Sequence, residues 1–310
     1  MRTAFVRTLL EEAERDDRIV LLTGDLGFMA LEPFRERFPE RFFNMGVAEQ
    51  NMIGVATGLA DAGYTPFCYS IVPFAVLRPF EFIRNGPVLH GLPVRIVGMG
   101  GGFEYGSAGP THFGLEDIGA ARLLQDTAVV APADAAQTVT AVRALAQWPG
   151  PAYLRLGKND RLVVPGLDGR FELGRAQQVR DGSDVMVFVM GSIAASVVDA
   201  ADLLLGEGIS AAVAIVSSIH PQPVDDVLDL VASHEHVVTI EAHVRSGGVG
   251  SLIAEILADH GSGCRLLRLG VDKPFGHRGG SEGYLNQLHG LSAPTIATRI
   301  AAFVGGRIDL

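Results

Sequence analysis

Hydrophobic residues recur along the first half of the chain with two alternating spacings. Apolar positions at helical spacing between Phe5 and Ala13 predict an N-terminal helix, and the apolar run at 18–22 predicts a buried strand that ends at residues 23–25. Strands that alternate with helices are typical of a mainly parallel sheet covered on both faces. Further strands are expected at 66–70, 94–99, 127–130 and 152–156, with helices that follow Glu49 and cover 74–84, 115–124 and 134–146.

The same pattern restarts in the second half of the chain. A stretch rich in Gly, Pro, Asp and Arg between residues 157 and 174 indicates a linker. We therefore predict an α/β protein with two doubly wound domains, at residues 1–160 and 175–310, joined by a linker at 161–174. In the smaller second domain, strands are expected at 184–190, 209–216 and 237–240, and helices at 194–205, 250–258 and 294–303.

The composition and charge of the chain limit the kinds of molecule that it could bind. The chain has 310 residues, of which 48% are hydrophobic, and a net charge of −10, so it can bury a core but offers no basic face for nucleic acid. Cys68 and Cys264 fall in different halves and give neither a disulfide framework nor a zinc spacing. No signal peptide is visible at the start, and no apolar run reaches the roughly 18 residues of a membrane span. We expect a cytoplasmic protein with small-molecule substrates and no membrane partner.

The first candidate for chemistry is Glu49, the one carboxylate in a segment that is otherwise small and apolar. Such a carboxylate must be hydrogen-bonded, paired or protonated. It also stands in the first turn of the predicted helix, where the helix dipole alone would favour an acid. Both interpretations remain open from the residues alone.

Three other residues follow predicted strands or lie inside one. Phe74 comes after a strand, at the sheet edge where ligands of open α/β sheets bind, although core packing is the simpler explanation. His112 ends Gly-Pro-Thr-His behind the glycine-rich run Gly98–Gly109 and could donate a hydrogen bond or shuttle a proton. Arg155 lies in an apolar strand and needs a partner, either an anionic substrate group or a structural salt bridge.

One further candidate lies in the second domain. Glu241 and His243 end a strand, and Gly247–Gly250 opens the next helix. This combination indicates either an anion site at a helix N-terminus or plain packing.

Taken in order, Gly-x-x-Glu at 46–49, the aromatic loop at Phe74, Gly-Pro-Thr-His at 109–112 and the arginine strand resemble the transketolase family of thiamine-diphosphate enzymes. The resemblance covers the whole chain, but only the second half of a typical family member. Residues 1–160 resemble the family's pyrimidine-binding domain, and residues 175–310 resemble its carboxy-terminal domain.

The resemblance implies contacts with thiamine diphosphate. Glu49 would bond to the aminopyrimidine ring and stabilise its imino form, whose nitrogen removes the proton from the thiazolium carbon. Phe74 would pack on that ring, and Ile71 stands where relatives often carry a second aromatic residue. Asp25 and Leu26 resemble a segment near the cofactor at the subunit boundary.

The resemblance also implies substrate contacts. His112 matches a histidine that contacts the donor, and Arg155 and Arg2 match arginines that bind the phosphate of sugar substrates. Two positions depart from the family pattern: Ala108 replaces an aspartate that bonds to a substrate hydroxyl, and Phe113 stands where Gln is common. Both departures predict a less polar pocket, and hence a donor or acceptor other than an ordinary phosphorylated sugar.

One family motif is missing from the sequence. Relatives hold the cofactor diphosphate through Mg²⁺ with Gly-Asp-Gly and a later Asn, whereas Gly24-Asp25-Leu26 lacks the second glycine. We therefore expect a separate diphosphate-binding N-terminal subunit that holds most of the Mg²⁺ site, and a heterotetramer with two copies of each chain. The leading interpretation is one subunit of a split transketolase-like transferase that moves a two-carbon ketol or related acyl unit. The alternatives are the β subunit of a 2-oxo acid dehydrogenase, a pyruvate-decarboxylating synthase of the same superfamily, and a non-catalytic structural subunit.

Overall fold

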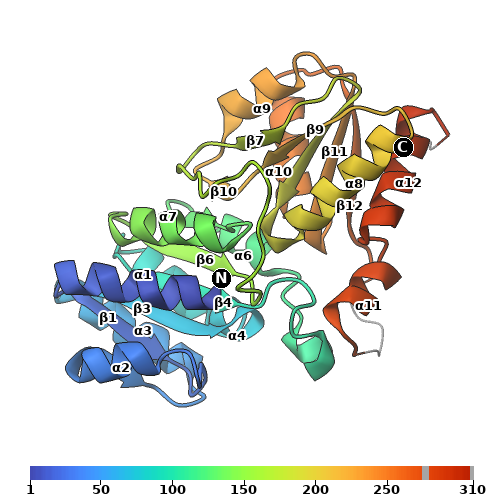
Figure 1. Cartoon of the computed structure of the whole chain (residues 1–310). Helices are drawn as coiled ribbons and strands as arrows, with labels where there is room; N and C mark the ends of the chain where they lie inside the picture. The colour runs from blue at the N-terminus through green and yellow to red at the C-terminus, as the bar shows by residue number, and fades with distance from the viewer. Residues whose placement is uncertain (274–278, 308–310) are drawn as a thin grey trace.

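The computed structural model describes residues 1–273 and 279–307, which form two α/β domains (Figure 1). The first domain contains a sheet in the order β10-β5-β6-β4-β3-β1-β2. All neighbouring strands are parallel except β10, which is antiparallel to β5. The strands are β1 (Ile19–Thr23), β2 (Phe42–Asn44), β3 (Thr65–Ile71), β4 (Arg95–Met99), β5 (Ala128–Val130), β6 (Ala152–Leu156) and β10 (Ser218–His220).

Helices cover both faces of this sheet, as expected for buried parallel strands. Ile19 and Leu21 of β1 pack in one apolar cluster with α1 and α7, whereas Val20 and Leu22 pack in another cluster with α3 and α4. The strand is therefore buried on both sides, with alternate residues facing opposite layers. The helices are α1 (Arg2–Arg15), α2 (Glu32–Arg37), α3 (Glu49–Asp61), α4 (Val72–Val76), α5 (Phe80–Ile83), α6 (Asp117–Arg122) and α7 (Ala135–Ala146).

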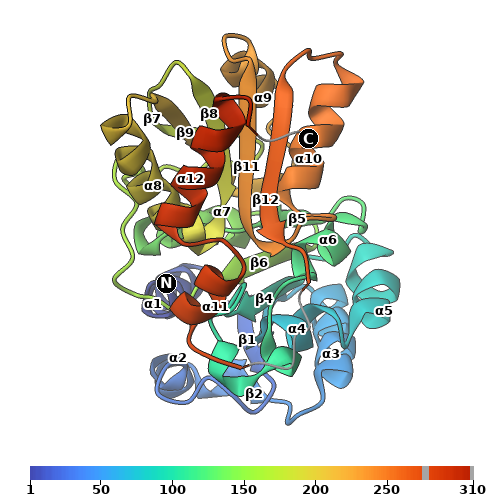
Figure 2. The same ribbon diagram turned by 90° about the vertical axis from the view of Figure 1, so that its right-hand side faces the viewer.

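The second domain contains a smaller sheet in the order β12-β11-β8-β9-β7, with β7 antiparallel to β9 and the other pairs parallel. Helices α8 and α12 lie on one face of this sheet, and α9 and α10 lie on the other (Figure 2). The elements are β7 (Gln177–Arg180), β8 (Val185–Met190), α8 (Ala194–Gly206), β9 (Ala211–Ile215), α9 (Val224–Val231), β11 (His236–Val244), α10 (Val249–Asp259), β12 (Arg265–Val271), α11 (Glu282–Leu288) and α12 (Ala293–Val304).

The predicted class of fold is confirmed, with two corrections to its elements. The helix predicted over 74–84 is wrong: α4 ends at Val76, and α5 begins only after Pro79, whose missing N–H and ring do not suit a helix interior. Strand β10 lies beyond the predicted linker yet joins the first sheet, so the two sheets do not divide strictly along the chain. The hydrophobic pattern did not predict α2, β2, β7, β10, α9, β12 and α11, most of which are short.

The segment predicted as a linker is packed against the domains. Val164 and Leu167 are buried in the core of the second domain, and Thr140 of α7 donates a hydrogen bond to Gly169 O. Asp134 caps α7, because its Oδ1 accepts from Gln137 N at 2.8 Å. Of the helices in the part of the chain that the structure describes, none is long and apolar enough to cross a bilayer.

Candidate functional site

The candidate site lies at the carboxyl edge of the first sheet. The parallel strands β1, β3, β4 and β6 all end at this edge, so the segments that follow them gather there. Glu49 opens α3, Phe74 lies in α4 directly after β3, and His112 ends the 3-10 turn Pro110–His112 in the long connection after β4.

Glu49 is a buried, fully engaged carboxylate. It is 1% exposed, its Oε2 accepts from Arg78 Nη1 at 2.9 Å, and its Oε1 accepts from Ser70 Oγ at 3.3 Å. Gly24 closes the remaining side, because a Cβ at this position would lie 3.3 Å from Oε1. The carboxylate is therefore both paired and hydrogen-bonded, as its surroundings in the sequence required.

Phe74 and His112 lie next to each other, and Arg78 connects Phe74 to this carboxylate. Their ring centroids are 5.1 Å apart and the planes meet nearly edge-on, at 80°. The guanidinium of Arg78 links them to Glu49, because its Cζ lies 5.0 Å from the centroid of the Phe74 ring. Glu49, Phe74 and His112 thus belong to one series of contacts that runs through Arg78, a residue that the sequence pattern did not predict. The sequence feature that pointed to such a residue was the buried carboxylate of Glu49, which needs a cation as its partner.

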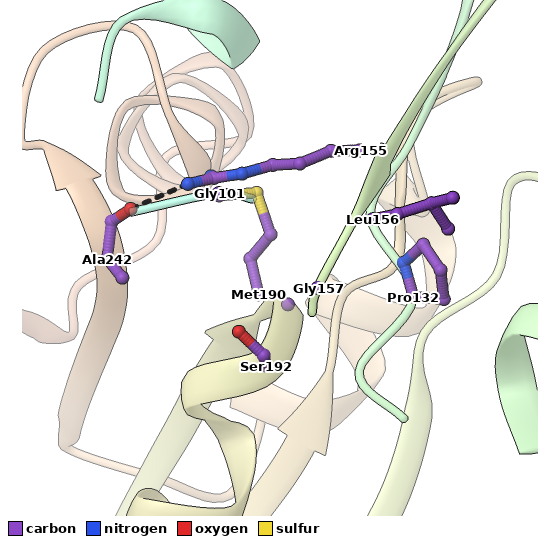
Figure 3. A pocket seen from close by; sticks show the side chains of 9 residues that line it. Gly101, Pro132, Arg155, Leu156, Gly157, Met190, Ser192 and Ala242 are labelled. Atoms are coloured by element: carbon purple, nitrogen blue, oxygen red, sulfur yellow. Dashed lines mark hydrogen bonds between the residues drawn. The ribbon is translucent and has the colours of Figure 1, made fainter. Parts of the chain in front are cut away.

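Arg155 occupies a different environment from the one that the resemblance implied. Its side chain is 7% exposed, its Nη2 donates to Gly114 O at 2.7 Å and Ala242 O at 2.8 Å, and its Nε lies 3.5 Å from Asp117 Oδ2. Figure 3 shows the side chain reaching across to Ala242 beside a cavity of about 10 Å³, which has room for at most one water molecule. These contacts favour the structural salt bridge over a phosphate site. The exposed cation at the end of β6 is Lys158, whose Nζ lies 4.1 Å from the centroid of the Tyr105 ring.

The residues that the resemblance placed around the cofactor lie on the same edge. Ile71 ends β3 half-buried, one residue before α4. Asp25 and Leu26 follow β1; Asp25 Oδ1 accepts from Asn44 Nδ2 at 2.9 Å, and Leu26 O accepts from Thr23 Oγ1 at 2.9 Å. Their polar atoms thus hold the turn after β1 together.

The remaining residues that the resemblance assigned to the substrate pocket differ in how exposed they are. Arg2, the first residue of α1, lies half-buried, and its charge opposes the rise that burial causes in the pKa of Tyr105. Ala108 is exposed at the end of a 3-10 turn. Phe113 is 3% exposed and packs edge-on against Phe103 at 5.0 Å, so the expectation that it lines the pocket is wrong. Its ring fills the core on the side of the second domain.

The possible anion site in the second domain is filled by the protein itself. Glu241 Oε2 accepts from Val249 N at 2.9 Å, and its Oε1 accepts from Gly250 N at 3.0 Å, at the start of α10. Burial raises the pKa of Glu241 to about 7 and lowers the pKa of His243 to about 4. This arrangement supports the interpretation as packing. Residues 1–273 and 279–307 contain no group of three or more His, Cys, Asp or Glu side chains placed to hold a metal ion.

The fold and this site define a two-domain α/β protein with a buried carboxylate and an aromatic ring at the carboxyl edge of its first sheet. Residues 1–161 match the transketolase pyrimidine-binding domain, and residues 174–296 match the transketolase C-terminal domain. The chain belongs to the transketolase family.

Relatives of known sequence and structure resemble the chain over nearly its whole length. A transketolase C-terminal section of Methanocaldococcus jannaschii is 36% identical over 97% of this chain and 95% of its own length. The 6-deoxy-6-sulfo-D-fructose transketolase subunit SqwH of a Clostridium species is 36% identical over 96% of this chain and 92% of its own length. A solved structure described as a split gene transketolase, inactive beta4 tetramer, has a TM-score of 0.89 and 34% identity over 99% of both chains. A 1-deoxy-D-xylulose-5-phosphate synthase of Syntrophotalea carbinolica is 35% identical over 97% of this chain, which matches only 47% of that protein.

Proposed function

We propose that this chain is the pyrimidine-binding subunit of a split, thiamine-diphosphate-dependent transketolase-like transferase. The observation that carries the proposal is the buried Glu49 carboxylate, which Arg78 links to the aromatic ring of Phe74, whose own neighbour is the imidazole of His112. Relatives that match this chain end to end are named as a section or a subunit of a transketolase. Their names support a division of the enzyme between two chains.

The residues at the site fit the aminopyrimidine half of the cofactor. A nitrogen-rich aromatic ring needs a hydrogen-bonding carboxylate in a dry setting and an apolar surface to stack on, and Glu49 and Phe74 supply these. Gly24 adds room, because a side chain at that position would crowd the carboxylate. When bound, the thiazolium ring of thiamine diphosphate supplies the electron sink for breaking and forming carbon–carbon bonds.

This chain's own residues would bind, orient and move protons. Glu49 would hold the pyrimidine ring by a hydrogen bond to its carboxylate, and the burial of Glu49 would keep water from competing for that bond. Phe74 and Ile71 would supply the apolar surface for the ring, and Asp25 and Leu26 would lie near it in the turn after β1. His112 hydrogen-bonds to an oxygen of the donor substrate.

We propose that the anionic end of the substrate meets Lys158 and Arg2. Both are cations that the structure leaves at least partly exposed, unlike Arg155. Ala108 offers no partner to a substrate hydroxyl, so the substrate differs there from an ordinary phosphorylated sugar. Restoring the partner by Ala108→Asp should raise activity with xylulose 5-phosphate as donor and ribose 5-phosphate as acceptor; an unchanged rate would contradict this part of the proposal.

The partner would be a separate N-terminal subunit that holds the diphosphate and most of the Mg²⁺ site, in a heterotetramer with two copies of each chain. The test is reconstitution with a neighbouring gene product that carries Gly-Asp-Gly, followed by turnover and circular dichroism with thiamine diphosphate and Mg²⁺. Glu49→Gln should lower kcat by a factor of about 10²–10⁴ without preventing assembly. Thiamine-dependent turnover by this chain alone would refute the need for a partner, and full activity of Glu49→Gln would refute the role of Glu49.

The similarity to a 1-deoxy-D-xylulose-5-phosphate synthase keeps one alternative worth testing. A synthase-type enzyme would accept pyruvate as donor and release CO₂, whereas a ketol transferase would not. Measuring CO₂ release from pyruvate in the reconstituted pair separates the two.

A further inference from the structure

Arg78 touches the same two groups that the proposed function reserves for the aminopyrimidine ring. Its Nη1 donates to Glu49 Oε2 at 2.9 Å, and its guanidinium lies 5.0 Å from the centroid of the Phe74 ring. A planar cation with several N–H donors satisfies a carboxylate and an aromatic face in the same way as a protonated aminopyrimidine would. We infer that Arg78 is a gate that occupies the pyrimidine half-site of the free chain and leaves when the cofactor enters.

The Arg78 guanidinium and an aminopyrimidine ring cannot occupy this half-site at the same time. Aromatic partners stack with centroids about 4.5–7 Å apart, and the Arg78 guanidinium already lies within that range of the Phe74 ring. Glu49 is 1% exposed, and Ser70 and Gly24 close in on its Oε1. The Oε2 that Arg78 binds is therefore the oxygen that an incoming ring can reach only by displacing the guanidinium.

Arg78 is placed to move. It lies between α4 and α5, and its side chain is 41% exposed, whereas the side chain of Glu49 is 1% exposed. Within the described part of the chain, Glu49 is the only hydrogen-bond acceptor of its guanidinium. A rotation into solvent would thus break one ion pair and one contact with a ring, and the cofactor would replace both.

The gate also explains how the free chain tolerates a buried carboxylate. An ionised Glu49 without a cation would carry a large desolvation cost, which Arg78 offsets until a ligand supplies the hydrogen bond. This inference rests on the proposed function, because it takes the aminopyrimidine as the ligand that displaces Arg78.

The first measurement concerns the free chain and needs no cofactor. A double-mutant cycle of Arg78→Ala and Glu49→Gln, followed by thermal unfolding, measures whether the two side chains interact. Arg78→Ala should lower Tm more in the native sequence than in the Glu49→Gln background, where the contact with Phe74 remains and the ion pair does not. Equal effects in both backgrounds would show that the pair does not form, and would overturn the gate whatever the cofactor.

The second measurement is competition with a ligand that lacks the diphosphate. Thiamine is titrated against the chain, and its Kd is obtained by ligand-observed NMR for the native sequence, Arg78→Ala and the control Arg84→Ala. Arg84 is an exposed arginine six residues further on, whose Nη1 bonds to Asn85 Oδ1. Removal of the gate should tighten binding about three- to tenfold, and the control should leave it unchanged.

The outcomes separate the gate from the proposed function. Binding that depends on Glu49 but is equal or weaker in Arg78→Ala would overturn the gate alone, because Arg78 would then help to hold the ring. Absence of thiamine binding by the native chain and by both arginine variants would overturn the gate, because no ligand would then displace Arg78; the proposed function is decided separately, by turnover of the reconstituted pair.

Discussion

Arg155→Ala tests whether this arginine is a structural clamp or a substrate-binding residue. In the folded chain its guanidinium donates to Gly114 O and Ala242 O and lies 3.5 Å from Asp117 Oδ2. Truncation would remove this partner from the fully buried Asp117 carboxylate and from Ala242 O, whereas Gly114 O would keep its hydrogen bond from Gly102 N. Breaking a buried ion pair costs about 3–5 kcal/mol, and each orphaned polar group adds about 1–3 kcal/mol, part of which water entering the new cavity offsets. We expect the free energy of unfolding to fall by at least about 3 kcal/mol.

The assay is urea unfolding of the full chain followed by circular dichroism. Arg155→Lys should fall between the native chain and Arg155→Ala, because an ammonium keeps the charge but cannot make the same forked contacts. Arg161→Ala is the matched control, because this arginine is exposed and its side chain makes no hydrogen bond with any described residue; its backbone N–H donates to Asn159 Oδ1. The control should change the free energy of unfolding by less than about 0.5 kcal/mol. A loss below about 1 kcal/mol for Arg155→Ala, with a large rise in KM for an anionic substrate, would refute the clamp and restore the substrate role.

Three further changes test the site and the fold. Because burial lowers the pKa of His243 to about 4, the unfolded chain binds its proton first, so the contribution of His243 to stability falls by up to ~3 kcal/mol as the pH drops from 6.5 to 4, while Glu241, whose pKa burial raises to about 7, acts in the opposite sense; His243→Gln should therefore be more stable, relative to the native chain, at pH 4 than at pH 6.5, and a urea-stability curve parallel to that of the native chain would contradict the assignment. Gly24→Ala puts a Cβ 3.3 Å from Glu49 Oε1 and should weaken thiamine binding several-fold by NMR, whereas Gly54→Ala, which meets no atom within 4 Å, should not. Asp134→Ala removes the acceptor of Gln137 N and Val164 N and should cost about 2 kcal/mol or more in urea unfolding, whereas Asp134→Asn, which keeps one acceptor oxygen, should cost less.

The sequence predicted those parts of the fold whose hydrophobic pattern is clear and whose ends are marked by Gly or Pro. Strand β6 runs from Ala152 to Leu156 as predicted, because a short apolar run bounded by Gly and Pro leaves little choice of ends. Strand β10 was missed because it has three residues and pairs antiparallel with a strand from the other half of the chain. Such a pairing is decided by how the two domains meet, and no local pattern encodes it.

The site residues were predictable where the type of residue requires a particular environment, such as a partner for a buried carboxylate. They were not predictable where the role depends on the direction in which the side chain points. Glu49 needed a partner, but the partner Arg78 lies in a break between two short helices that the sequence predicted as one helix. His112 and Phe113 are neighbours in sequence, yet the imidazole faces Phe74 while the Phe113 ring is buried against Phe103. Proximity along the chain therefore could not tell which of the two lines the site.

The contacts between the domains give the second domain a role at the site, although Glu49, Phe74 and Arg78 all belong to the first. The connection from β4 to α6, which carries Ala108 and His112, is held by backbone bonds from the second domain: Val244 N donates to Leu115 O at 2.9 Å, and Gly280 N donates to Gly106 O at 3.0 Å. Arg155 fastens the same connection to Ala242. Under the proposed function, the first domain would supply the groups for the aminopyrimidine, and the second would fix the loop that carries His112. Changes in the second domain should therefore alter substrate preference before they alter cofactor binding.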